Sequence, residues 1–344
     1  MIQIDLSSDT VTQPSRPMRE AMATAMVGDE QRGEDPSVNE LCARVAELLG
    51  HESAIFLPSG IMCNQVAICV HCSTGDEVLT ADISHILQTE GGSASAIAGA
   101  IVKPIPSNRG IFSVESLSDL LRAPSVRRPK QRLVSMEQTS SRGGGAVWSL
   151  EALRSVCDWT RSQGLGLHLD GARLMNAAVS SGHEASDFAA GFDSAWLCLT
   201  KGLGCPVGAV LAGSKDFIAE AWAWKQRLGG AMRQAGIVAA AGVYALNHHI
   251  DRLAVDHANA KLLGDLISES SRIDVLPVDT NIVIFDIDDH PNQTSRNNYD
   301  QTLESLGVRI RNEGRGRYRA ITHLDVDANQ IRRAADHILD VVEE

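Results

Sequence analysis

Short apolar runs alternate with helical segments through the first two thirds of the chain. The apolar runs are typical of buried strands, and the amphipathic segments between them are typical of helices. Strands that alternate with helices form a mostly parallel sheet covered by helices on both faces. We therefore predict an α/β fold with strands at residues 53–57, 77–79, 101–105, 132–136, 165–169, 194–199 and 209–212.

The two ends of the chain depart from this alternation. The N-terminal segment contains Pro14 and Pro17 and is predicted to be an extended arm that leads into a helix at about residues 18–27. An amphipathic helix is expected at residues 37–50, ended by Gly50. The C-terminal part predicts strands near residues 274–276, 282–286 and 318–321 and a closing helix at 328–342. We therefore divide the chain into an N-terminal arm (1–20), a large domain (21–245) and a small α+β C-terminal domain (246–344).

Length, charge and cysteine content narrow the class of protein. The 344 residues allow a large core and two domains, and the net charge of −12 argues against nonspecific binding to nucleic acid or anionic membranes. No apolar run reaches membrane-spanning length, and no secretion signal is visible at the N-terminus. Most of the seven cysteines lie in apolar runs, as reduced core residues do, so we expect a cytoplasmic location. The Cys69-Val70-His71-Cys72 segment has no second cluster beside it, so no metal site is predicted.

Two neighbouring predicted strands each carry one charged residue to their C-terminal ends. Asp170 follows one apolar run, and Lys201 follows the next. Ligands of open α/β sheets bind at these strand ends, so both side chains are expected at one site. An amine that condenses with an aldehyde and a carboxylate that keeps a pyridine nitrogen protonated suit pyridoxal 5′-phosphate (PLP). Ser59 and Gly60 open a helix whose free amides suit the cofactor phosphate.

A series of motifs spans nearly the whole chain in order. They are residues 5–14 (DLSSDTVTQP), 33–39 (GEDPSVN), 56–64 (FLPSGIMCN), 85 with 90–92 (H, EGG), 168–173 (HLDGAR), 198–208 (CLTKGLGCPVG), 229–236 (GGAMRQAG) and 319–326 (RAITHLDV). With these motifs the chain resembles the threonine aldolase and beta-eliminating lyase family of fold type I PLP-dependent enzymes. The resemblance implies an aspartate-aminotransferase-like large domain, a small amino-acid substrate, and a homodimer or homotetramer with its sites at the subunit interface.

The resemblance also implies which residues meet the cofactor. Lys201 would anchor the cofactor covalently, Asp170 would pair with the pyridinium nitrogen, and His85 would stack on the ring or act as a base. These three residues are the catalytic candidates. Around the cofactor phosphate the resemblance places Ser59, Gly60, Ile61 and, from the neighbouring subunit, Arg233.

Substrate binding is implied for another group of residues. Arg319 would clamp the substrate carboxylate in a fork of hydrogen bonds, Ser8 would add a contact, and Arg173 would reach the carboxylate or the phenolic oxygen of the cofactor. Arg32 stands where the family commonly has an aromatic residue, and Ser140 stands where it has a second active-site histidine. Both lie on the side of the pocket that would meet the β-substituent of the substrate.

These departures leave three hypotheses open. The first is retro-aldol cleavage of a β-hydroxy-α-amino acid, of the L-threonine or L-allo-threonine type, to glycine and an aldehyde. The second is racemisation of a small amino acid such as alanine, which needs no group for a substrate hydroxyl and so fits the loss of the histidine at Ser140. The third is a noncatalytic PLP-binding protein, against which the retention of Lys201, Asp170, Arg173 and Arg319 argues.

Overall fold

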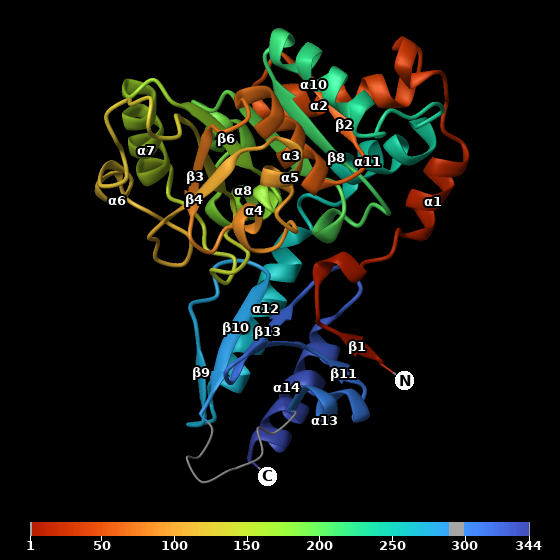
Figure 1. The fold of residues 1–344 in the computed structure, drawn as a ribbon. Coiled ribbons are helices and arrows are strands. Elements are labelled where there is room, and N and C mark those ends of the chain that lie inside the picture. The colour runs from red at the N-terminus through yellow and green to blue at the C-terminus, as the bar shows by residue number, and fades with distance from the viewer. Residues whose placement is uncertain (1, 289–298, 344) are drawn as a thin grey trace.

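The alternating runs form one seven-stranded sheet in a computed structural model that describes residues 2–288 and 299–343 (Figure 1). Its strand order is β2-β8-β7-β6-β5-β3-β4, and β8 runs antiparallel to both of its neighbours while the other pairings are parallel. The mostly parallel sheet predicted from the sequence is confirmed. The strands are β2 (Ser53–Leu57), β3 (Glu77–Ala81), β4 (Ile101–Ile105), β5 (Gln131–Glu137), β6 (Gly166–Asp170), β7 (Ser194–Cys198) and β8 (Ala209–Gly213).

Helices cover both faces of this sheet because successive strand residues point to opposite sides. In β6, Leu167 and Leu169 enter the larger apolar core, whereas His168 and Asp170 point toward α3 on the other face. The larger core is closed by α2 (Pro36–Leu49), α7 (Leu150–Ser162), α8 (Leu174–Ser181) and α11 (Gly236–His248). The opposite face is covered by α3 (Gly60–His71) and α10 (Lys215–Arg227). Short helices lie in the connections: α4 (His85–Gln88), α5 (Ser93–Ile97), α6 (Val114–Ser118) and α9 (Ala185–Ala189).

Helix boundaries follow their capping residues. Ser149 caps α7 by accepting a hydrogen bond from the amide of Ala152 at 3.2 Å, and Gly50 ends α2 in the left-handed conformation at φ 69°. The first helix, α1 (Arg16–Ala23), begins and ends earlier than residues 18–27. It begins there because Ser15 caps it, with proline in its first turn.

A smaller antiparallel sheet, in the order β12-β13-β10-β9, lies beyond the large one (Figure 1). Long helices α12 (Leu253–Ile267) and α14 (Ala328–Glu343) pack against it and share an apolar core with it. The strands of this sheet are β9 (Ile273–Val275), β10 (Ile282–Ile287), β12 (Arg311–Gly314) and β13 (Arg317–Ile321), and α13 (Tyr299–Ser305) lies nearby. None of the helices within residues 2–288 and 299–343 combines the length and apolarity needed to cross a membrane.

The N-terminal segment is more structured than an extended arm. Its strand β1 (Ile4–Asp5) pairs in parallel with β11 (Val308–Arg309), and a 3-10 turn at Asp9–Val11 then lies against the turn that begins at Lys201. Sequence periodicity missed β1 and β11 because a two-residue ladder is too short to show a pattern. The segment therefore contacts the C-terminal part of the chain through β11 and the strand ends of the large sheet through the turn at Lys201.

Candidate active site

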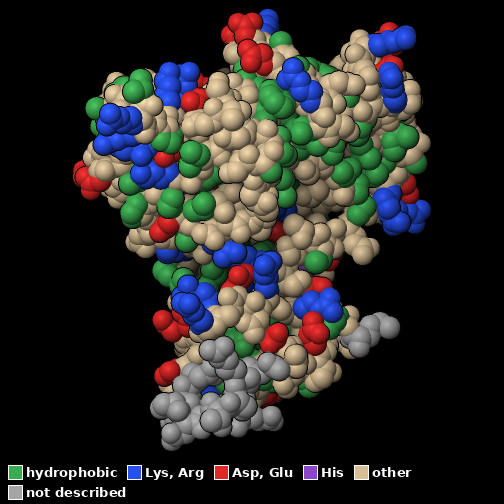
Figure 2. Space-filling view, in the orientation of Figure 1, with side chains coloured by type: hydrophobic (Ala, Val, Ile, Leu, Met, Phe, Trp, Pro, Cys, Tyr) green, Lys and Arg blue, Asp and Glu red, His purple; other side chains and the backbone are tan. Residues whose placement is uncertain are grey.

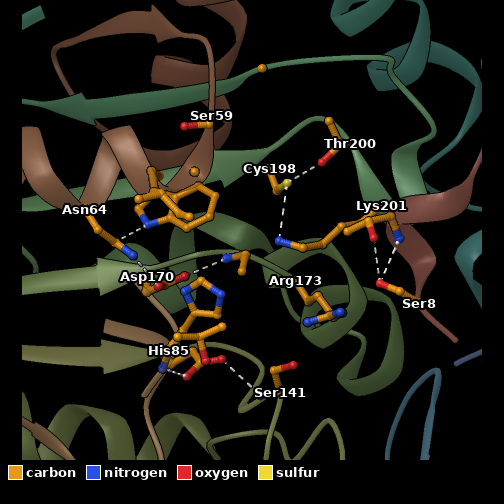
Figure 3. Close-up of a pocket in the computed structure, with 18 of the residues that line it drawn as sticks. Ser8, Ser59, Asn64, His85, Ser141, Asp170, Arg173, Cys198, Thr200 and Lys201 are labelled. Carbon is orange, nitrogen blue, oxygen red and sulfur yellow. Dashed lines mark hydrogen bonds between the residues drawn. The ribbon is translucent and has the colours of Figure 1, made fainter. Parts of the chain in front are cut away.

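A cavity of about 440 Å³ opens at the C-terminal ends of β5, β6 and β7 (Figure 3). The predicted cofactor residues that line it are Ser59, Gly60, Ile61, Asp170, Arg173 and Lys201. The predicted ring-stacking and substrate residues that line it are His85, Ser8 and Arg319. These residues come from strand ends, helix starts and the N-terminal segment, as expected for a ligand site in an open α/β sheet.

Asp170 is a buried carboxyl group that lines the cavity at the end of β6. One carboxylate oxygen accepts from the side-chain amide of Asn64 at 2.8 Å, and the other accepts from the backbone amide of Ala172 at 3.0 Å. Burial raises the pKa of Asp170, although the charge of His85 and the Asn64 hydrogen bond act in the opposite sense. No cation contacts this carboxylate among the described residues, so it is suited to a protonated ring nitrogen in the cavity.

Lys201 begins the turn after β7 in the left-handed conformation, at φ 62°. Such a backbone is costly for a residue other than glycine and persists where neighbouring groups hold it. Thr12 holds it by donating its hydroxyl to the carbonyl of Lys201 at 2.9 Å. The amine Nζ lies 3.5 Å from Sγ of Cys198, 5.7 Å from the centre of the Trp196 ring, and next to no carboxylate within the described part of the chain. The amine is therefore available for covalent chemistry.

A polar network behind the cavity orients His85 and Asp170 together. Asn64 donates to Glu90 at 2.7 Å as well as to Asp170, and Nδ1 of His85 lies 2.9 Å from the same Glu90 oxygen. The indole nitrogen of Trp196 donates to Asn64 at 2.8 Å. Burial alone would lower the pKa of His85, but the Glu90 hydrogen bond and the nearby carboxylates raise it overall.

Glu137, at the end of β5, is a second buried carboxyl group in the cavity wall. It accepts hydrogen bonds from the backbone amides of His85 at 3.1 Å and Ser141 at 3.0 Å. Burial, and then the charge of Asp170, raise the pKa of Glu137 to about 7. This carboxyl group can therefore hold or release a proton near neutral pH.

Two arginines, Arg173 and Arg319, also line the cavity, and each has a different carboxylate partner. Arg173 is buried and makes a double ion pair with Asp9, with both N–O distances 2.7 Å. Burial alone would lower the pKa of Arg173, but Asp9 raises it overall. Arg319 is also buried and lies 3.3 Å from a carboxylate oxygen of Glu313, and its Nε has no hydrogen-bond partner among the residues that the structure describes. Burial lowers the pKa of Arg319 to about 10. A buried donor without a partner suits a substrate carboxylate.

The start of α3 supplies the expected anion site. Ser59 caps this helix through the amide of Met62 at 3.2 Å. A Cβ at Gly60 would lie 2.3 Å from the Trp196 ring, so only glycine fits there. The exposed side chain of Ile61 has no hydroxyl group that could bind a phosphate. Thr200, which has one, also lines the cavity. The helix amides and these hydroxyl groups suit a phosphate.

Three predicted residues lie outside this cavity. Arg32 and Arg233 both contact Asp29, at 3.8 Å and 2.8 Å, so they are close to each other but not to the cavity of the same chain. The role of Arg233 toward a neighbouring subunit stays a prediction. Ser140 is buried and does not line the cavity, and its hydroxyl has no hydrogen-bond partner in the described part of the chain. Ser141 lines the cavity in its place.

Sequence reasoning assigned no role to several residues that build this site. Asn64 and Glu90 lie within the motifs that carry the family resemblance, and Thr200 directly precedes Lys201. These positions in the sequence could have identified all three as site residues. Glu137 directly follows the predicted strand at 132–136 and lies near Ser140, where the chain departs from the family, so it could have been found in the same way. Within the described residues, no group of three His, Cys, Asp or Glu side chains is placed to hold a metal ion.

The sheet order, with a free lysine and a buried carboxylate at neighbouring strand ends, defines an enzyme of the aspartate-aminotransferase-like fold, fold type I. Residues 5–290 match the family model described as beta-eliminating lyase, and the chain belongs to this family. It is 38% identical to the low specificity L-threonine aldolase of Escherichia coli over 335 residues, which cover 97% of this chain and 98% of that protein. It is 36% identical to low-specificity L-threonine aldolase 1 of Arabidopsis thaliana, over 96% of this chain and 94% of that one.

Solved structures share the fold at lower sequence identity. The threonine aldolase of Leishmania major superposes with a TM-score of 0.84 at 19% identity, covering 98% of this chain and 99% of that one. The agreement extends over both sheets because nearly the whole chain is covered. The fold type I architecture expected from the sequence is thereby confirmed.

Proposed function

We propose that this enzyme is a PLP-dependent lyase that cleaves the Cα–Cβ bond of a β-hydroxy-α-amino acid of the L-threonine or L-allo-threonine type. The products would be glycine and an aldehyde. The observation that carries the proposal is the single cavity that holds the free Lys201 amine, the buried Asp170 carboxylate and the unpartnered Nε of Arg319. The relatives at 36% and 38% identity, which are named threonine aldolases, support the same reaction.

The residues present fit PLP as the cofactor. Lys201 would anchor it, Asp170 would keep its ring nitrogen protonated, and the α3 start would bind its phosphate through Ser59 and Gly60. Trp196 and the Asn64 network keep Asp170 away from water and fixed in place. When bound, the cofactor would supply an electron sink for the negative charge that develops at Cα.

The protein side chains would orient the scissile bond and move one proton. Arg319 would hold the substrate carboxylate and so fix the orientation of the Cα–Cβ bond. His85, or Glu137 beside it, would take the proton of the β-hydroxyl group as that bond breaks. Glu137 suits this role because its pKa of about 7 lets it exchange protons at neutral pH.

A substrate panel tests the reaction. The purified enzyme should release glycine and an aldehyde from threonine, allo-threonine or phenylserine. Aldehyde release and exchange of the α-proton in deuterated water are both measured, with L-alanine included in the panel. Absence of aldehyde from every hydroxy amino acid, together with rapid racemisation of alanine, would overturn the proposed lyase activity.

Racemisation remains a second candidate because of one observation. The family's second histidine is replaced by Ser140, whose side chain is buried and does not line the cavity. A racemase needs one proton-transfer group on each face of Cα, and Lys201 with His85 or Glu137 would supply them. Alanine racemisation in the same panel decides between the two activities.

The titration of Glu137 predicts a measurable dependence of stability on pH. Its folded pKa of about 7 lies above the value of about 4.3 for an unfolded glutamate. Between these values the folded state holds more protons, so the free energy of unfolding falls as pH rises. Between pH 5 and pH 8, the free energy of unfolding of the wild type should fall by on the order of 1–3 kcal/mol relative to that of Glu137→Gln.

Urea unfolding of both proteins at the two pH values measures this difference. Glu220→Gln, at an exposed position on α10, is the matched control and should follow the wild type. Parallel stability profiles for the wild type and Glu137→Gln would show that Glu137 titrates as an ordinary carboxylate.

We also propose that the enzyme is at least a homodimer with a cytoplasmic location. The segments around Arg32 and Arg233 bind each other through Asp29 and lie outside the cavity of their own chain, which suits a contribution to a neighbouring site. All seven cysteines are free, which suits a reducing compartment. Light scattering on the purified enzyme would give the subunit number.

A further inference from the structure

The rim of the active-site cavity carries more positive charge than a single substrate carboxylate requires. Arg142 and Arg311 line this cavity in addition to Arg173 and Arg319. A second cavity of about 720 Å³ shares Arg142 and Arg319 with the first, and Arg315 and Arg317 also line it. Figure 2 shows several Lys or Arg side chains where the large and small parts of the molecule meet.

The acidic partners on this rim do not balance the arginines. Arg317 is fully paired with Asp286, at 2.8 Å and 2.7 Å. Within the described residues, Glu313 is the only carboxylate paired with Arg311, at 3.2 Å, and with Arg319, at 3.3 Å. These two arginines are cross-strand neighbours in β12 and β13. Like charges opposite each other are destabilising, and one carboxylate leaves the pair with a net positive charge.

Arg142 and Arg315 lack any carboxylate partner within residues 2–288 and 299–343. Arg142 lines both cavities, so its charge would act on a ligand that extends from the first cavity into the second. The two cavities together therefore present a region with uncompensated positive charge next to the reaction site.

The backbone turn around Arg142 is held in place. The amide of Ser141 donates to Glu137 at 3.0 Å, and Nε of Arg109 donates to the carbonyl of Gly143 at 2.8 Å. A Cβ at Gly143 would lie 2.0 Å from the carbonyl oxygen of Arg109, so the turn requires glycine there. Figure 3 shows Ser141, the residue before Arg142 in the chain, at the opposite end of the cavity from Ser59 in the proposed phosphate site.

We propose that Arg142, Arg311 and Arg315 bind an anionic group on the β-substituent of the substrate. The preferred substrates are then β-hydroxy-α-amino acids whose β-substituent ends in a carboxylate or a phosphate. Arg319 holds the α-carboxylate, and the second anion extends toward Arg142 and the adjoining cavity. This inference rests on the proposed lyase function and specifies its substrate class.

The reaction needs no further reactant. The Cα–Cβ bond breaks, the β-hydroxyl carbon becomes an aldehyde, and the hydroxyl proton leaves to a protein base. Cα then takes up one proton, so the substrate divides into glycine and an anionic aldehyde with no change in the total of atoms or electrons.

Glycine formation compares substrates directly, since every substrate yields it. The probes are threonine, 3-hydroxyaspartate and 4-phosphooxythreonine, which are neutral, carboxylate-bearing and phosphate-bearing at the β-substituent. At least one anionic probe should exceed threonine in kcat/KM by about tenfold or more. The better of the two anionic probes identifies the anion. Equal or better cleavage of threonine than of both anionic probes would overturn the proposal.

Two variants test the arginines themselves. In Arg142→Gln and Arg315→Gln, the ratio of kcat/KM for the anionic probe to that for threonine should fall about tenfold. Arg142→Lys should recover part of the ratio because it keeps the charge. Arg154→Gln, which removes an arginine paired with Asp187 far from the cavity on α7, should leave the ratio unchanged. An unchanged ratio in both cavity variants would contradict the proposal.

A binding measurement separates this inference from the lyase proposal. L-Aspartate and L-asparagine have nearly the same shape but differ in charge, and neither carries a β-hydroxyl group. Calorimetry on the holoenzyme should show tighter binding of aspartate, with the difference reduced in Arg142→Gln. Selective aspartate binding without any glycine formation would overturn the lyase function alone, whereas equal binding of both ligands would overturn the anion subsite.

Discussion

Replacing Lys201 by alanine should remove the visible absorbance of the bound cofactor and lower the rate of glycine formation at least about 10³-fold. Loss of a nucleophile that forms the covalent link to the cofactor has effects of this size because no neighbouring group can replace it. The described residues around Lys201 offer Cys198 and Thr200 but no second amine. Absorbance and steady-state assays on the purified variant measure both effects.

Lys261→Ala is the matched control for this variant. Lys261 is an exposed lysine on α12, paired with Asp265, and its loss should change neither the absorbance nor the rate. Circular dichroism establishes that both variants fold. If folded Lys201→Ala kept the absorbance band and the activity, Lys201 would not be the cofactor anchor.

Replacing Asp9 by alanine should lower the free energy of unfolding by about 3–5 kcal/mol. The variant would leave Arg173 buried without its carboxylate partner, since both of its ion-pair contacts go to Asp9. It would also remove one of two acceptors of the side-chain amide of Asn281, which donates to Asp9 at 3.1 Å and to the carbonyl of Thr322 at 3.1 Å. Urea unfolding with a tryptophan fluorescence readout measures the loss.

An exposed ion pair gives the comparison for this effect. Glu20 pairs with Arg16 at 2.9 Å, and both side chains are more than half exposed, so Glu20→Ala should cost less than about 1 kcal/mol. The double variant Asp9→Ala with Arg173→Met should be more stable than Asp9→Ala alone, because it removes the unpaired charge. A similar small loss for Asp9→Ala and Glu20→Ala would show that burial does not strengthen the Asp9–Arg173 pair.

The strands around the site could be predicted because local patterns specify them. Short runs rich in apolar and β-branched residues predict strands, and β2 and β4 have the predicted bounds as a result. The paired strands β1 and β11, by contrast, have two residues each and leave no periodic signal. Their pairing joins residues about 300 positions apart, which only long-range packing can decide.

The same distinction holds for the site. Lys201 and Asp170 were found because each ends an apolar run, and Arg319 was found within a motif. The ion pair of Arg173 with Asp9 was not predicted, since it links residues 164 positions apart. The neighbouring carboxyl of Glu137 was also overlooked, because its unusual pKa comes from burial and from Asp170 rather than from its own sequence neighbours.

The sequence by itself determined the sheet, the strand ends that carry Asp170 and Lys201, and the family to which these motifs belong. These features depend on the residue types within short stretches, where spacing and hydrophobicity act directly on the backbone. Only the tertiary structure decided that Ser140 faces away from the cavity while Arg142 borders it. It also decided the pairing of Arg173 with Asp9 and the raised pKa of Glu137. Burial and charge pairing depend on which distant segments meet, and folding alone brings Glu137, Arg311 and Arg319 to one cavity and pairs Asp9 with Arg173 in its wall.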